Sequence, residues 1–258
     1  MFRGIEVYKG RKFSEKTAVL PSQIRKKIEY MMTVGEHRTL NGASIILAEL
    51  CGGLLGLRRS EHFASSEGKP NMTTLLCYRN LAGSTWDLSI CSVQHCIKKW
   101  ASELSTGEVC RVRLCYSKHQ RHRVAHEVIA GPGYKDLSFV RWIKVVVRLR
   151  LQLGEKLTTS SPLLVRSRGR TIVPMTGAFM SRMDKAYAPI LRWGKATIHS
   201  RRRGFATAAV RSGLHMAKIM IALRHSQGVT LQYVALSIGD KAAITTRLAI
   251  DAYRAQFS

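Results

Sequence analysis

Apolar residues recur at helical spacing near the start of the chain and again through its second half. Pro21 suits the first turn of a helix, so a helix is predicted from Pro21 to about Met32. The next begins near Asn41, is apolar on most sides and therefore buried, and ends at a group of glycines. Later helices are predicted at Ile97–Leu104, Asp136–Leu153, Thr176–Ile190, Arg201–Ser212, His215–Arg224, Val229–Leu236 and Asp240–Ala255.

The middle of the chain has a different pattern, with short β-rich segments separated by Gly, Asn and Ser-Lys-His-Gln stretches. Strands are predicted at Thr73–Tyr78, Trp86–Val93, Val109–Tyr116 and Val124–Ile129. The stretch Leu157–Arg170 is interpreted as a loop or a short strand. The expected fold class is α+β, mostly helical with a small antiparallel β-sheet, and no internal repeat is present.

Charge narrows the choice of partner. The 258 residues include 42 Lys and Arg against 16 Asp and Glu, a formal net charge of +26. Such an excess repels itself in a compact chain, so a polyanion is the expected partner. The arginines are spread along the whole sequence rather than along one amphipathic helix, which favours nucleic acid over a membrane surface.

The start of the chain is polar and charged, without the apolar segment of a secretion signal. We therefore expect an intracellular protein that is not secreted and has no membrane partner. Six cysteines form no Cys-x-x-Cys pair, although three histidines lie near them: His95, His119 and His122. The spacings are not those of zinc fingers, so reduced and mostly buried thiols are preferred to a metal site.

Breaking and rejoining a phosphodiester without a metal needs a nucleophile, cations for the oxygens on phosphorus, and a proton for the leaving oxygen. Arginine suits the second task because its planar fork binds phosphate in a bidentate way. His199 and Arg202 are three residues apart at the start of a predicted helix, on the face where a phosphate is favoured. Tyr233 follows on the next predicted helix but one.

Four segments in order carry a resemblance to a known family. They are Gly56-Leu-Arg-Arg-Ser-Glu61, Ser117-Lys118, His199-Ser-Arg-Arg-Arg-Gly-Phe-Ala-Thr207 and Arg224-His-Ser-Gln-Gly-Val-Thr-Leu-Gln-Tyr233. This order resembles the tyrosine recombinases (phage integrases), most of all those of eukaryotic mobile elements. The resemblance spans about Leu20 to Tyr233 and rests on the ordered conjunction, since each segment alone is common.

The resemblance implies a role for each matching residue and no cofactor or metal. Tyr233 would attack the phosphate and form a 3′-phosphotyrosine, while Arg58 and Arg202 would bind the non-bridging oxygens. Lys118 would protonate the leaving 5′-oxygen, His199 and His225 would assist at the phosphate, and Glu61 would position an arginine. We expect further DNA contacts from basic neighbours of these positions: Arg59, Arg201, Arg203 and Arg224. The implied partner is double-stranded DNA, bound by a homotetramer during synapsis, in the nucleus if the host is eukaryotic.

The sequence departs from the family pattern in several places. Arg224 stands where the family usually has Gly, Arg201 replaces an apolar residue, and the interval from His225 to Tyr233 is one residue shorter. We expect residues 1–18 to form a basic tail or remnant linker and 19–258 the catalytic domain, with an insertion at about 68–104. The N-terminal core-binding domain that closes the family's clamp on DNA is expected to be absent.

Three hypotheses follow. The first is DNA strand breakage and rejoining in recombination or integration, which explains why every catalytic residue type occurs in order. The second is a decayed recombinase domain that binds DNA without cleaving it, which explains the missing clamp and the shortened interval. A type IB topoisomerase would require a Ser-Lys-x-x-Tyr ending, and the chain has none.

Overall fold

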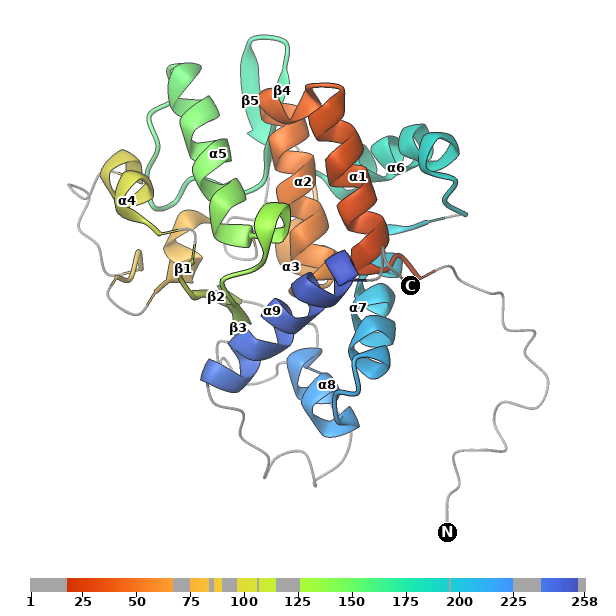
Figure 1. The fold of residues 1–258 in the computed structure, drawn as a ribbon. Helices are drawn as coiled ribbons and strands as arrows, with labels where there is room; N and C mark the ends of the chain where they lie inside the picture. The colour runs from red at the N-terminus through yellow and green to blue at the C-terminus, as the bar shows by residue number, and fades with distance from the viewer. Residues whose placement is uncertain are drawn as a thin grey trace.

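In a computed structural model of the chain, the described residues are 18–66, 75–83, 86–89, 97–105, 107–114, 126–194, 196–224 and 238–254. Within these residues the fold combines nine α-helices with two small antiparallel sheets (Figure 1), which confirms the α+β class. The helices are α1 Pro21–Thr33, α2 Leu40–Gly53, α3 Arg59–His62, α4 Ile97–Glu103, α5 Phe139–Gln152, α6 Gly177–Leu191, α7 Ile198–Arg211, α8 Met216–Ala222 and α9 Ile238–Arg254.

Helix α2 is the centre of the core. Every residue from Leu40 to Gly53 except Asn41 is buried, as its lack of a polar face predicts. The Thr39 hydroxyl caps the helix by accepting the Gly42 N–H at 3.0 Å. Helices α1, α5 and α7 and strand β4 all pack against α2, and Figure 1 shows it between α5 and α1. The segments that precede and follow α2 are therefore attached to one buried helix.

The larger sheet has the order β1-β2-β3 and is antiparallel throughout. Its strands are β1 Leu81–Ala82, β2 Cys110–Leu114 and β3 His126–Ala130, and Cys110 pairs with Ala130. Helix α9 packs against β3. The smaller sheet is a two-stranded ribbon of β4 Val165–Arg168 and β5 Thr171–Pro174, within the stretch Leu157–Arg170 and just after it.

Two predicted strands are wrong over their described residues. In Thr73–Tyr78, the described residues make one isolated antiparallel bridge, between Cys77 and Pro162. The Asn80 side chain accepts the Cys77 N–H at 2.7 Å, and the chain continues as a 3₁₀ helix, Tyr78–Asn80. In Trp86–Val93, the described residues 86–89 form a single bridge, between Asp87 and Ala82. The predicted helix at Val229–Leu236 lies outside the described residues.

Three of the cysteines, Cys51, Cys77 and Cys110, are buried and form no disulfide bond. Burial raises the pKa of the Cys51 and Cys110 thiols far above its usual range, as expected for thiols in an apolar interior. Over the described residues, no helix has both the length and the apolarity needed to cross a bilayer.

Candidate phosphate-binding site

The segment that follows α2 presents Arg58 at the start of a short helix. Arg58 has extended backbone, with φ −75° and ψ 153°, and α3 begins at the next residue. Glu61 binds it twice, accepting the Arg58 N–H at 2.6 Å and its Nη1 at 3.1 Å. A carboxylate three residues into a helix is well placed for both bonds, because it satisfies an unpaired N–H of the first turn. Glu61 thus fixes the backbone and the guanidinium of Arg58 together.

Arg202 reaches this segment from helix α7. Its Nη1 donates to the Gly56 carbonyl and its Nη2 to the Leu223 carbonyl, so one guanidinium bridges the segment after α2 and the end of α8. The side chain is buried, with 4% of its surface exposed. The planar fork of arginine can hold two carbonyls at a fixed separation, which a lysine cannot do.

Arg224, the residue that follows the C-cap of α8, is the third arginine beside Glu61. Its φ of 55° is left-handed, and the turn directs the guanidinium back toward α3. There its Nη2 donates to Glu61 at 2.6 Å, while its carbonyl accepts Nη2 of Arg58 at 3.1 Å. We call Arg58, Arg202 and Arg224 the arginine cluster. Three segments far apart in the sequence therefore converge around Glu61.

The arginine cluster carries more positive than negative charge. Burial lowers the pKa of the Arg202 guanidinium to about 9, helped by repulsion from Arg224 and Arg58 and opposed by Glu61. Burial also lowers the pKa of Arg224, with Glu61 opposing and Arg58 adding to the effect. An anion with two or more oxygens would relieve this repulsion and accept the remaining N–H groups. Beside Arg224 there is a cavity of about 410 Å³, also lined by Phe205.

His62 supports the cluster from the protein interior, a role that the sequence did not predict. Its Nδ1 lies 2.7 Å from the Arg58 carbonyl, which can only accept, so Nδ1 carries the proton. Burial lowers the pKa of the imidazole to about 4, which keeps it neutral. Its Nε2 is buried and has no hydrogen-bond partner within the described residues. The position four residues after Arg58 is the one signal in the sequence that points to this bond.

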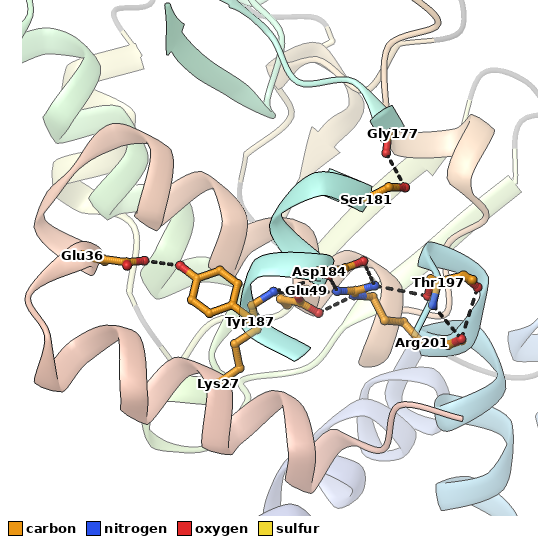
Figure 2. A network of polar contacts seen from close by, with 10 residues as sticks. Lys27, Glu36, Glu49, Gly177, Ser181, Asp184, Tyr187, Thr197 and Arg201 are labelled. Carbon is orange, nitrogen blue, oxygen red and sulfur yellow. Dashed lines mark hydrogen bonds and ion pairs between the residues drawn. The ribbon is translucent and has the colours of Figure 1, made fainter. Parts of the chain in front are cut away.

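Arg201 lies in the interior, contrary to the prediction that it contacts DNA. Only 1% of its surface is exposed, and it belongs to a buried ion-pair network of four side chains (Figure 2): Lys27, Glu49, Asp184 and Arg201. Its Nη2 lies 2.5 Å from both Glu49 and Asp184. The helical turn of α7 directs Arg201 toward α2 and α6, so its charge is neutralised inside the fold.

The other predicted residues differ in their surroundings. Arg59 is exposed on α3, His199 is exposed on the first turn of α7, and Arg203 is half-buried on α7. Lys118, His225 and Tyr233 lie outside the described residues. The structure thus brings together Arg58, Glu61, Arg202 and Arg224 out of the predicted set.

Among the residues that the structure describes, no group of three or more His, Cys, Asp or Glu side chains is arranged to hold a metal ion. No protein-family model matches the chain, and neither does any curated protein sequence.

Proposed function

We propose that this protein binds double-stranded DNA and breaks and rejoins its strands through a covalent phosphotyrosine on Tyr233. The observation that carries the proposal is that Arg58 and Arg202, although far apart in the sequence, belong to one cluster. Glu61 binds Arg58 and Arg224, and Arg202 binds the carbonyl of Gly56, two residues before Arg58. These are the two arginines for which the sequence resemblance implies contact with the scissile phosphate.

The proposed reaction consists of two transesterifications. The Tyr233 hydroxyl gives its proton to a histidine and attacks phosphorus, the bond from phosphorus to the 5′-oxygen breaks, and Lys118 supplies the proton to that oxygen. A 5′-hydroxyl then gives its proton to Lys118 and attacks the phosphotyrosine, and the Tyr233 oxygen leaves with the proton that the histidine returns. The number of phosphodiester bonds is conserved, so neither water nor ATP is consumed. His199 and His225 assist the proton transfers.

The arginine cluster would stabilise the charge that gathers on the oxygens of phosphorus. Its guanidiniums are held by Glu61 and by backbone carbonyls before any ligand binds, so little reorganisation accompanies the reaction. Arg224 would add a third cation at the position where the family has glycine. The proposal extends to a homotetramer on DNA and, for a eukaryotic host, to action in the nucleus.

Trapping the covalent intermediate tests the proposal. The full chain is incubated with a library of nicked duplexes, from which the short released strand diffuses away, and protein–DNA adducts are detected by denaturing electrophoresis. We expect an adduct that is lost in Tyr233→Phe and kept in Tyr134→Phe, a control at an exposed tyrosine. Arg58→Ala should lower the rate of adduct formation by about 10²–10³-fold. An adduct that persists in Tyr233→Phe would show that the nucleophile is another residue.

A second candidate function is DNA binding without cleavage. It is favoured by the bonds that the arginines already make: Arg202 donates to two backbone carbonyls, and Arg58 donates to Glu61 and the Arg224 carbonyl. Duplex binding without an adduct for any library member would select this function.

A further inference from the structure

The β4–β5 ribbon is a second basic feature, and it lies away from the arginine cluster. It spans Val165–Arg168 and Thr171–Pro174, with Arg168 paired to Thr171 next to the turn. Figure 1 shows it projecting past the neighbouring ends of α2 and α5. No other strand pairs with it among the described residues. The sequence between Lys156 and Met183 contains no Asp or Glu, so the ribbon carries only positive charge.

The turn places two arginines at the tip. Gly169 has a φ of +61°, whereas Arg170 is not among the residues with positive φ, which is the pattern of a type II′ hairpin turn. Residues 168–171 are all exposed. The tight turn keeps Arg168 and Arg170 close together at the end of the projection.

The base of the ribbon is fixed to the core. Asn41 accepts the Ser167 N–H at 2.7 Å and donates to the Ser167 carbonyl, which attaches β4 to the start of α2. Val165 and Met175 are fully buried, and the Met175 carbonyl accepts the Ala64 N–H at 3.0 Å. A rigid base means that little conformational entropy is lost when the tip meets a partner.

We propose that this ribbon enters a groove of double-stranded DNA and that Arg168 and Arg170 neutralise phosphates there. Two strands lie about 4.8 Å apart, and the major groove is about 12 Å wide, so a two-stranded ribbon fits. Asn41 is at the first turn of α2 and Gly56 is just past its end, so the ribbon base and the arginine cluster are about 20 Å apart along the 14-residue helix. The contact is therefore separate from the phosphate site and rests on the proposed function only for the identity of the partner.

The test is the salt dependence of DNA binding by the full chain. Fluorescence anisotropy with a 30-base-pair duplex gives the slope of log K against log salt for wild type, Arg168→Gln/Arg170→Gln and the control Lys98→Gln/Lys99→Gln. The control removes two exposed cations from α4, which keeps the change in net charge equal. We expect the slope of the ribbon variant to become shallower by about 1.8, because each neutralised phosphate contributes about 0.9. Affinity for a single strand of the same length should change much less, since a single strand has no groove.

A slope that changes no more in the ribbon variant than in the control would overturn the inference. An equal loss of affinity for duplex and single strand would also overturn it, by showing general attraction without groove binding. Either result can be told apart from failure of the proposed function. Anisotropy measures binding and requires no cleavage, whereas adduct trapping measures cleavage and requires no contact from the ribbon. Thermal unfolding of the ribbon variant should match wild type, since both side chains are exposed.

Discussion

Replacing Arg201 with methionine separates a structural role from a DNA-binding one. The guanidinium of Arg201 bonds both oxygens of Glu49 and both of Asp184. Methionine keeps much of the aliphatic volume but removes the charge and every one of these bonds. Lys27 is then the one cation of the buried network that faces its two carboxylates. We expect Arg201→Met to be strongly destabilised.

The expected size of this destabilisation depends on the buried carboxylate of Glu49. Burial alone raises the pKa of this carboxyl, yet the charges of Arg201 and Lys27 outweigh burial and lower the pKa from 4.5 to about 2. Removing one partner of a buried ion pair costs about 3–5 kcal/mol, because the remaining charge stays desolvated. We therefore expect the free energy of unfolding to fall by about 3–5 kcal/mol.

Urea unfolding and the salt dependence of DNA binding are measured on the same preparations. Arg201→Met should lower the urea midpoint and, while folded, keep the wild-type salt slope. Arg59→Gln is the control with the opposite expectation: Arg59 is exposed, so stability should change by less than about 0.5 kcal/mol while the slope falls. A loss below about 1 kcal/mol in Arg201→Met, together with a slope reduced by about 0.9, would refute the structural role.

Three further predictions concern the neighbourhood of the cluster. Burial lowers the pKa of His62 to about 4, below its unfolded value near 6.5. The free energy of unfolding should therefore fall by about 3 kcal/mol in total as the pH decreases from 6.5 to 4. Urea titrations at pH 7 and pH 5 should show that His62→Gln removes this dependence. An added Cβ at Gly204 would lie 1.7 Å from the Val19 carbonyl oxygen, so Gly204→Ala should lower the free energy of unfolding by about 1–3 kcal/mol. In the control Gly107→Ala, the added Cβ has no contact closer than 3.8 Å, so thermal unfolding should be unchanged. Arg202→Lys keeps the charge but cannot bridge two carbonyls, so its duplex affinity in anisotropy should fall, and an unchanged affinity would contradict the clamp geometry.

The sequence predicted most helices because their signals are local. Pro21 and the continuous apolar run in α2 needed no tertiary information. The strand predicted at Thr73–Tyr78 failed because strand propensity reflects how side chains fit a sheet, whereas the Asn80 amide offers the Cys77 N–H a competing local bond.

At the site, the sequence singled out Arg58, Arg202 and Arg224 among other basic residues, but it did not predict what each contacts. Arg201, Arg202 and Arg203 are consecutive, and the sequence led us to expect that all three contact DNA. The partners that distinguish them come from other elements: Glu49 and Asp184 neutralise Arg201, while the Gly56 and Leu223 carbonyls hold Arg202. The bond of His62 to Arg58 is local in sequence, but the burial that keeps the ring neutral is set by tertiary packing.

The positions of the carboxylates affect how the net charge of +26 acts at the protein surface. Among the residues that the structure describes, three of the chain's 16 acidic residues are buried together with the cations they bind: Glu49, Glu61 and Asp184. Each such pair removes a carboxylate from the surface, where it would otherwise neutralise an exposed cation or repel a phosphate. The tip of the β4–β5 ribbon is exposed, and the acid-free sequence around it supplies no local carboxylate. The buried ion pairs therefore also strengthen the attraction of the surface for a polyanion. Carboxylates that pair with cations in the interior cannot neutralise the exposed arginines and lysines.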